Sequence, residues 1–342
     1  MNKQVAQAKN ILVINLLYLG DLVFSTPFLR NLRKNYPTAK IDMVVNTNFL
    51  KVVENNPYLN DLYPYSKSYN LKESIAFALR LKKNHYDLGL NIHGSLRSNL
   101  LLSLINPGYK VGFAHGIMKF TLNRSLQPLN GCHMVDVYLQ FLRDMGITNI
   151  DDQGLELTVP KSALKKIELF LEKNKITRET RLIGLNTGGT WKTKRWTVEG
   201  FAQLADELQS IDHCQVVFLG GPGDLPRVKS IIGLMKTTPL MTTGQTSLTE
   251  LMALLEKCSL VISNDSGPVH IAAAVGTPTI TIFGPSDEIK YRPYGKNNLV
   301  VKSNLACRPC GKHECPLKHH KCMVDIKTEK ILQKAQLLLE AR

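Results

Sequence analysis

Segment 264–278 holds the residue types best suited to binding a charged ligand. It lies between the apolar runs 260–262 and 279–283, so the sequence predicts a strand, a polar turn, a short helix and a second strand. Pro268 suits the first position of that helix, and Gly276 suits the position just past its end. The turn therefore points free backbone N–H groups, at the positive end of a helix dipole, toward an anion such as a diphosphate.

Two side chains in this turn add groups that can hold a sugar. Asp265 supplies a carboxylate and His270 an imidazole, so sugar hydroxyls and phosphate oxygens can both find partners there. The chain contains no Asp-x-Asp sequence, a pattern that would position a divalent metal against a diphosphate. Helix N-termini and lysines would then neutralise the phosphates. The pattern predicts a nucleotide-sugar site.

Asp21 is a candidate catalytic residue. It stands between the apolar run 11–14, expected to be a strand buried on both faces, and a helix expected over 23–35. A carboxylate at the carboxyl end of a parallel strand can act as a general base toward an attacking hydroxyl. Alternatively, Asp21 only caps the following helix. The loop lacks the Gly-x-Gly-x-x-Gly pattern, so no dinucleotide cofactor is expected.

A basic loop that contains glycines follows the strand expected at 182–185. Gly188 and Gly189 allow close approach of a backbone, and Lys194 can neutralise a phosphate. Alternatively, this is a basic surface loop whose tryptophans pack inward. A glycine-rich turn at 220–224 either shapes a nucleotide pocket or is only a tight turn.

Four cysteines near the end of the chain are spaced as C-x2-C-x4-C-x6-C, with three histidines among them. The cysteines are Cys307, Cys310, Cys315 and Cys322. Thiolates at this density can hold zinc tetrahedrally. The spacing lacks the repeated Cys-x2-Cys pair of a zinc ribbon, so a redox-sensitive cluster and a compact cysteine-lined loop remain as alternatives.

Strands and helices alternate along the whole chain, which predicts parallel, doubly wound sheets. Two such series occur, joined near Pro160. We therefore expect two α/β domains, 1–160 and 161–327, facing a cleft, with ligands beyond the carboxyl ends of the strands. An apolar-striped helix over 328–342 would fit on either of them.

The composition is that of a folded globular protein: 342 residues, 44% hydrophobic and 21% charged, with a net charge of +15. The basic excess is spread over both halves, which argues against a basic arm for nucleic acid. Phosphorylated substrates, an anionic membrane surface or plain solubility account for it. We see no signal peptide and no run of about 20 apolar residues, so a cytoplasmic protein with reduced cysteines is expected.

Together, these motifs resemble glycosyltransferase family 9, the ADP-heptose:lipopolysaccharide heptosyltransferases. The matching stretches follow one another over nearly the whole chain and include 11–14, 19–21, 26–27, 184–186, 193–196, 264–268, 276–278 and 283–285. The cysteine segment is also similar to a tail found in many members.

The resemblance implies a GT-B architecture, with two Rossmann-like domains that bind the acceptor on the N-terminal side and the nucleotide sugar on the C-terminal side. The helix over 328–342 would pack back on the first domain. The resemblance further implies inverting transfer of heptose from ADP-heptose to the lipopolysaccharide inner core. No metal or other cofactor would be required. We expect a monomer with peripheral contact to the inner face of the inner membrane.

The resemblance also assigns roles to single residues. Asp21 matches the proposed general base, and Asp265 matches the carboxylate that grips heptose hydroxyls. The other expected donor-binding residues are Thr190, Lys194, Thr246, Ser247, Leu248, Ser266, Gly267 and His270. Family members carry a hydroxyl or charge where this chain has Gly189, which puts contacts at that position in doubt.

On the acceptor side, four residues follow expected strands or loops of the first domain and can meet acceptor phosphates, unless they are ordinary surface residues: His93, Arg97, Lys119 and Arg124. Two other functions fit the same features. One is a glycosyltransferase of this fold that uses another nucleotide sugar for a different surface glycan. The other is a non-catalytic protein that binds nucleotide sugar or lipopolysaccharide.

Overall fold

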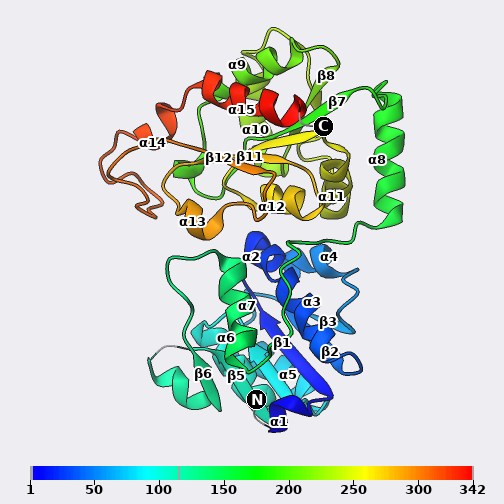
Figure 1. Cartoon of the computed structure of the whole chain (residues 1–342), viewed down its shortest axis with the longest axis vertical. Coiled ribbons are helices and arrows are strands. Elements are labelled where there is room, and N and C mark those ends of the chain that lie inside the picture. The colour runs from blue at the N-terminus through cyan, green and yellow to red at the C-terminus, as the bar shows by residue number, and fades with distance from the viewer. Residues whose placement is uncertain (1–2, 115, 341–342) are drawn as a thin grey trace. The chain divides into compact units, whose positions relative to one another are not determined.

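The computed structural model describes residues 3–114 and 116–340 and divides the chain into two compact units, Met1–Gly154 (unit 1) and Leu155–Arg342 (unit 2). Each unit contains one six-stranded sheet surrounded by helices (Figure 1). Every strand pair in both sheets is parallel. The predicted pair of doubly wound α/β units is therefore confirmed.

The sheet of unit 1 has the strand order β3-β2-β1-β4-β5-β6. Its strands are β1 (Asn10–Asn15), β2 (Lys40–Asn46), β3 (Asp61–Tyr65), β4 (Leu88–Asn91), β5 (Tyr109–Phe113) and β6 (Arg124–Leu126). The order reverses between β1 and β4, and sheets of this kind bind ligands beyond the carboxyl ends of that pair. Asp21 follows β1 and His93 follows β4, so both are placed at that edge.

The helices of unit 1 are α1 (Lys3–Ala6), α2 (Leu19–Phe24), α3 (Thr26–Asn35), η1 (Thr47–Phe49), α4 (Leu50–Val53), α5 (Leu71–Lys82), α6 (Leu96–Ile105), η2 (Gly116–Thr121) and α7 (Met134–Asp144). A break at Ser25 divides the helix predicted over 23–35 into α2 and α3. Pro27 has no N–H for the carbonyl of Val23, and the hydroxyl of the preceding threonine donates to that carbonyl instead, at 2.9 Å. The break leaves Asp21 in the first turn of its own short helix.

The sheet of unit 2 repeats this topology, with the order β12-β11-β10-β7-β8-β9. Its strands are β7 (Arg181–Asn186), β8 (Cys214–Leu219), β9 (Leu240–Met241), β10 (Leu260–Asn264), β11 (Thr279–Phe283) and β12 (Asn298–Lys302). β7 and β10 are the pair at which this order reverses. The carboxyl ends of β7 and β10 are therefore the expected ligand edge of unit 2.

The helices of unit 2 are α8 (Lys161–Lys173), η3 (Lys192–Lys194), α9 (Val198–Gln209), η4 (Pro222–Asp224), α10 (Leu225–Ile232), α11 (Leu248–Lys257), α12 (Gly267–Ala274), α13 (Glu288–Tyr291), α14 (Lys321–Val324) and α15 (Thr328–Glu340). None of the helices described is long and apolar enough to cross a membrane.

The last helix, α15, packs within unit 2. Ile331, Ala335 and Leu339 are buried and join the hydrophobic core of that unit. Their spacing places them in one stripe of the helix, which faces α9 and the strands β10 to β12. This corrects the expectation that a helix over 328–342 packs back on the first domain; residues 341–342 of that range lie outside the described residues.

Candidate active site

Asn264, the last residue of β10, holds the ends of β7 and β10 together. Its buried amide nitrogen donates to the carbonyls of Thr187 and Gly188, at 2.8 and 3.1 Å. Its amide oxygen accepts from the backbone N–H of Trp196 at 3.0 Å. One side chain therefore fixes both ends of the loop that carries Lys194. No local sequence pattern indicated this role for Asn264.

The loop brings Lys194 to Asp265, and the two form an ion pair. The Lys194 Nζ lies 2.7 Å from the Asp265 Oδ2, and their side chains are 18% and 4% exposed. The Ser286 hydroxyl donates to the same carboxylate oxygen at 2.5 Å. The ammonium also lies 4.5 Å from the ring centre of Trp191. Because an ammonium has three donors, Lys194 can hold Asp265 and an anion together.

The N-terminus of α12 follows Asp265 closely in the chain, as the sequence predicted. Ser266 is the N-cap in an extended conformation, but its side chain makes no capping hydrogen bond. Its hydroxyl instead accepts from the side-chain amide of Asn186 at 2.7 Å. The first turn, which begins at Gly267 and includes the buried His270, thus keeps the helix-end geometry that favours an anion.

The other expected donor residues lie at the same edge of the unit 2 sheet. Thr190 is exposed in the loop after β7. Thr246, Ser247 and Leu248 lie where the chain passes from β9 into α11, and the Ser247 side chain caps that helix by accepting from the backbone N–H of Glu250 at 3.3 Å. The capping role accounts for this serine without a ligand.

The two glycine-rich turns of unit 2 pack against each other. A Cβ on Gly188 would lie 2.6 Å from the Asp224 Oδ1, whereas a Cβ on Gly189 would meet no atom closer than 3.5 Å. Asp224 also accepts from the backbone N–H of Gly221 at 3.0 Å. Because position 188 approaches Asp224 this closely, it requires a glycine. The turn at 220–224 therefore supports the loop that carries Lys194.

In unit 1, Asp21 and His93 belong to a cluster that also contains Lys67. Burial lowers the pKa of Lys67, and the negative charge of Asp21 opposes that shift. The Lys67 Nζ lies 4.2 Å from the ring centre of Tyr18, and the Arg97 guanidinium donates to the Lys67 carbonyl. Sequence reasoning missed Lys67, although it follows β3 and so lies at the same edge as the residues after β1 and β4.

His93 is neutral near pH 7 in this cluster. Burial, followed by the charge of Lys67, lowers the pKa of His93 to about 4. Its buried Nδ1 has no hydrogen-bond partner among the described residues. An uncharged imidazole with a spare ring nitrogen can exchange a hydrogen bond with a polar ligand.

The remaining two acceptor candidates lie elsewhere in unit 1. Lys119 is exposed on η2, and Arg124 is exposed at the start of β6, the edge strand. The structure does not link either of them to Asp21, Lys67 or His93 by a contact within the described residues.

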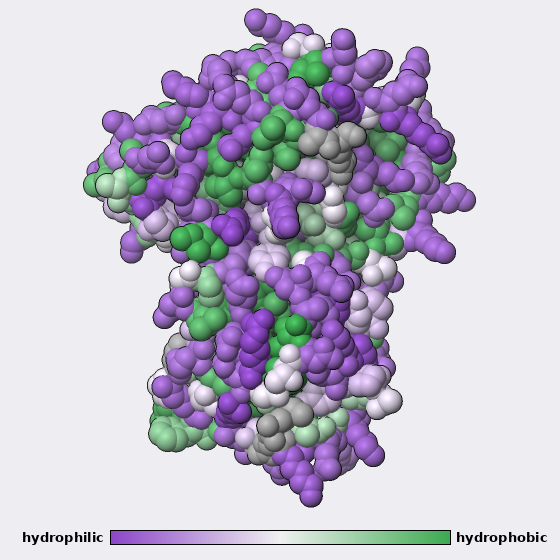
Figure 2. Space-filling model, in the orientation of Figure 1, coloured by the Kyte–Doolittle hydropathy of each residue, from purple (hydrophilic) through white to green (hydrophobic). Residues whose placement is uncertain are grey.

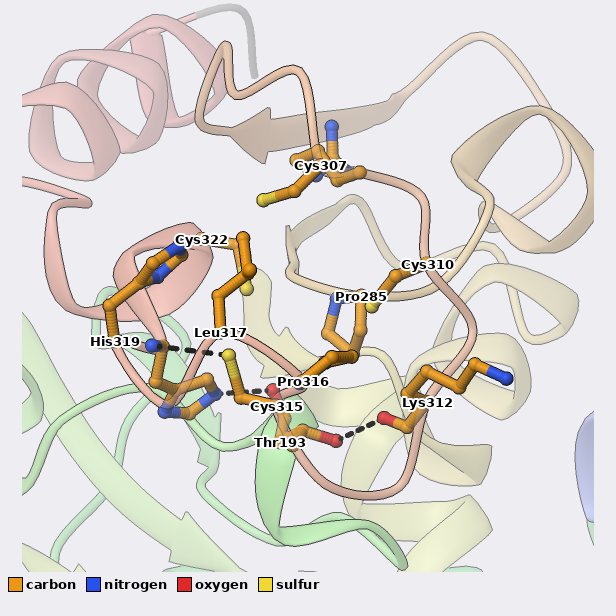
Figure 3. Close-up of a pocket in the computed structure, with 12 residues that line it drawn as sticks. Thr193, Pro285, Cys307, Cys310, Lys312, Cys315, Pro316, Leu317, His319 and Cys322 are labelled. Atoms are coloured by element: carbon orange, nitrogen blue, oxygen red, sulfur yellow. Dashed lines mark hydrogen bonds between the residues drawn. The ribbon is translucent and has the colours of Figure 1, made fainter.

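The four cysteines of the C-terminal segment line one cavity of about 190 Å³ together with Thr193 (Figure 3). All four are free thiols. As the side chains stand, no group of three or more His, Cys, Asp or Glu residues within the described parts of the chain is arranged to hold a metal ion.

Comparisons with known proteins agree with this architecture. Residues 74–321 match the family model described as Glycosyltransferase family 9 (heptosyltransferase). Lipopolysaccharide heptosyltransferase 3 of Escherichia coli K12 is 31% identical over 293 residues, 82% of this chain and 84% of that protein. Lipooligosaccharide heptosyltransferase 2 of Campylobacter jejuni is 27% identical over 333 residues, 94% and 96% of the two chains.

Two solved structures extend the likeness to three dimensions. A family 9 glycosyltransferase from Veillonella parvula superimposes with a TM-score of 0.92 at 28% identity, covering 98% of each chain. The E. coli ADP-heptose lipopolysaccharide heptosyltransferase II has the same fold, with a TM-score of 0.80 at 24% identity over 97% and 99% of the chains. The fold is thus of the GT-B class, and the chain belongs to glycosyltransferase family 9.

Proposed function

We propose that this enzyme transfers heptose from ADP-heptose to a hydroxyl of the lipopolysaccharide inner core. The observation that carries the proposal is the Lys194–Asp265 ion pair at the N-terminus of α12. It combines a cation and helix N–H groups for a diphosphate with a carboxylate for sugar hydroxyls. Membership of family 9 and relatives named as lipopolysaccharide heptosyltransferases support the choice of sugar and acceptor.

Unit 2 is proposed to bind the donor. The first turn of α12 and the Lys194 ammonium would bind the diphosphate, while Asp265, held by Ser286, would accept from heptose hydroxyls. Thr190 would contact a phosphate, and residues 246–248 would lie near the nucleoside. As the bond to ADP breaks, these fixed charges stabilise the negative charge that develops on the leaving group.

Unit 1 is proposed to bind and activate the acceptor. The Asp21 carboxylate takes the proton of the attacking hydroxyl, whose oxygen forms a bond to the anomeric carbon. The bond from that carbon to the diphosphate oxygen breaks on the opposite face, and ADP leaves with the electron pair. The configuration is therefore inverted. Lys67 and Arg97 supply positive charge for a phosphorylated acceptor, and the neutral His93 supplies a hydrogen bond.

We propose that this transfer does not use a divalent metal. The chain has no Asp-x-Asp sequence, and the charge of the diphosphate is matched by Lys194 and the helix N-terminus. Each substrate has its own unit within one chain, so a monomer contains every group that the proposed reaction needs.

An exposed apolar surface on unit 1 supports peripheral contact with the cytoplasmic face of the inner membrane, where a lipid-linked acceptor would lie. Leu96, Leu100 and Leu104 recur at intervals of four residues on α6 and are 62%, 47% and 40% exposed. Ile117 and Phe120 on the neighbouring η2 are 79% and 90% exposed. In Figure 2 a hydrophobic patch lies on unit 1 where Figure 1 shows the teal segment at residues 116–121.

Basic residues accompany this surface, since Lys119 lies on η2 and Arg124 begins the next strand. Apolar side chains inserted at the headgroup level, with cations beside them, suit an anionic lipid surface. Co-sedimentation with vesicles that contain phosphatidylglycerol tests this contact. Phe120→Glu should release the protein, whereas Leu169→Glu on α8, a matched exposed position at 57%, should not. Equal binding by both variants would refute the surface.

Calorimetric titration with ADP, UDP and GDP tests the donor. We expect selective binding of ADP, and selective binding of UDP would refute the choice of ADP-heptose. Turnover is then measured as ADP release with a heptose-free core acceptor. Mass spectrometry of the lipopolysaccharide core from a deletion strain should show the loss of one heptose; loss of a different sugar would point to another nucleotide sugar, and an intact core to a non-catalytic protein.

A further inference from the structure

Residues 303–320 form a long segment without helix or strand, between β12 and α14. Not one of these residues is buried. Segments longer than about 12–15 residues without regular structure are uncommon in compact domains and are usually functional or disordered. With so little apolar burial, the hydrophobic effect contributes little to holding this segment in one conformation. Its order must depend on other interactions.

A few polar contacts attach the segment to the end of β11 and to the loop at residues 187–197, which follows β7 and carries Lys194 and is called the donor loop below. The Thr193 hydroxyl donates to the carbonyl of Lys312 at 2.9 Å, and a ring nitrogen of His320 lies 2.7 Å from the Thr193 carbonyl. The Gly311 N–H donates to the carbonyl of Pro285 at 2.8 Å. Nearer its start, the Arg308 guanidinium donates to the Gly284 carbonyl at 2.8 Å and pairs with Glu288 at 3.1 Å. These contacts attach the segment to the rest of unit 2.

The four cysteines come from different turns of the chain and line one cavity. Cys307 and Cys310 come from the first part of the segment, Cys315 from a turn in the second part, and Cys322 from α14, yet all line the same cavity (Figure 3). The other three cysteines of the chain lie outside this cavity, in unit 1, at the start of β8 and at the end of α11. Four thiols from three separate turns thus gather where the segment lacks a core.

These four thiols form a donor set that suits a thiophilic cation. All four are free, and the Cys315 sulfur accepts from the backbone N–H of His320 at 3.4 Å. Zinc and iron prefer sulfur ligands of this kind, and a bound divalent cation keeps coordinating thiols deprotonated.

We infer that Cys307, Cys310, Cys315 and Cys322 bind one thiophilic metal ion, zinc or iron, that cross-links residues 303–322. The sulfurs line the cavity without meeting at one point, so binding turns the side chains inward about their Cα–Cβ bonds. Three of the four cysteines are exposed or half-buried and are free to make this rotation. Four thiolates around one ion form the tetrahedral sulfur site that zinc and iron prefer.

The neighbouring histidines already have other partners. His320 contacts the Thr193 carbonyl, and the His319 Nδ1 accepts from the backbone N–H of Lys321 at 3.0 Å. His313 packs on Trp191, with 4.0 Å between ring centres. The ligand set is therefore four cysteines, and the metal has a structural role apart from the proposed transfer reaction.

The metal site also supports donor binding. Thr193 is the residue before Lys194, and it exchanges hydrogen bonds with Lys312 and His320 of the segment. In addition, the Trp191 ring contacts both His313 and the Lys194 ammonium. Loss of the metal would free the segment and loosen the loop that positions Lys194. We expect the KM for the donor to rise several-fold while the chemistry at Asp21 is unaffected.

Elemental analysis of the full chain, purified without chelator, tests the site independently of activity. We expect roughly one zinc or iron ion per chain, and Co²⁺ loaded into the metal-free protein should give the visible and thiolate charge-transfer absorption of a tetrahedral thiolate site. Zinc and iron are told apart by the analysis itself. Less than about 0.1 ion per chain before and after reconstitution, or acid-labile sulfide accompanying iron, would overturn a single-ion site.

Variants assign the ligands. Cys307→Ser/Cys310→Ser changes two accessible positions, and circular dichroism would verify that the protein is folded. We expect it to lose the metal and the cobalt spectrum, whereas Cys132→Ser, a half-buried cysteine of unit 1, should keep both. A double variant that retains a full complement of metal would refute the assignment, whatever the outcome of the transferase assay.

Discussion

Lys194→Met separates the contribution of the Lys194–Asp265 ion pair to stability from its contribution to transfer. Methionine keeps the length and the apolar stem of the lysine but removes its charge. Asp265, 4% exposed, then keeps the hydrogen bond from the Ser286 hydroxyl but has lost its ammonium partner. Because a buried carboxylate has lost its counter-ion, we expect the folded state to be destabilised.

The geometry sets the size of that effect. At 2.7 Å the gross attraction between the charges is roughly 6 kcal/mol for an effective dielectric constant of about 20. Desolvation of both groups opposes most of it, and the 18% exposure of the lysine allows some screening. We therefore expect Lys194→Met to lower the free energy of unfolding by about 2 kcal/mol. Loss of a fixed donor to the leaving group should slow transfer roughly 100- to 1,000-fold.

The double variant Lys194→Met/Asp265→Asn decides between the two roles. It removes the unpaired charge, so most of the lost stability should return. Transfer should remain as slow as in the single variant, because neither the phosphate cation nor the sugar carboxylate is restored. Urea denaturation measures the stability, and ADP release at saturating acceptor measures the rate. Lys192→Met, an exposed lysine on the same loop, is the matched control and should change neither quantity.

Three results would contradict this reasoning. If the single variant transferred heptose within threefold of the parent rate, Lys194 would not stabilise the leaving group. If the double variant recovered both stability and turnover, the ion pair would serve only to hold the loop. Unchanged stability in the single variant would show that the buried carboxylate finds another partner.

Three further predictions follow from other parts of the structure. Asp21→Asn should reduce turnover at least about 100-fold while ADP binding to unit 2 stays unchanged in calorimetry; undiminished turnover would exclude Asp21 as the base. Gly188→Ala should lower the free energy of unfolding by about 1–3 kcal/mol, because its Cβ would lie 2.6 Å from the Asp224 carboxylate, whereas Gly189→Ala should be nearly neutral. Equal melting temperatures for the two alanine variants would contradict that packing. Finally, the lowered pKa of His93, about 4, means that the unfolded chain binds its proton first as the pH falls, so stability is lost between about pH 6.5 and 4. Between pH 7 and 5, His93 should lower the free energy of unfolding by about 1–2 kcal/mol, and this loss should be absent in His93→Gln. The same dependence of stability on pH in the parent and the variant would refute it.

The sequence predicted the strands well because parallel strands are buried on both faces and appear as continuous apolar runs. The turn at Asp265 was predictable for a local reason, since Pro268 and Gly276 mark the two ends of α12. The break at Ser25 was missed, although Pro27 carried the signal. The apolar stripe of α15 indicated a buried face but could not say which sheet that face would cover.

The residues that support the site were not predictable in the same way. Asn264 fixes a loop whose contacted residues lie more than 60 positions earlier in the chain, and Ser286 reaches Asp265 from beyond the next strand. Lys67 joins Asp21 through the packing of three separate strand ends. These contacts arise from tertiary structure, and no local pattern or periodicity marks them.

The donor loop contains the only tryptophans of the sequence, Trp191 and Trp196. Trp196 is 1% exposed and donates from its indole to the carbonyl of Ile326, while Trp191 lies between Lys194 and an aromatic neighbour. Intrinsic fluorescence excited at the indole band therefore comes from this loop alone. The protein therefore contains its own fluorescent reporter: Trp196 is held rigidly in the core, and the emission of Trp191 responds to changes around Lys194. Its emission can follow nucleotide binding and metal exchange in real time, without any change to the chain.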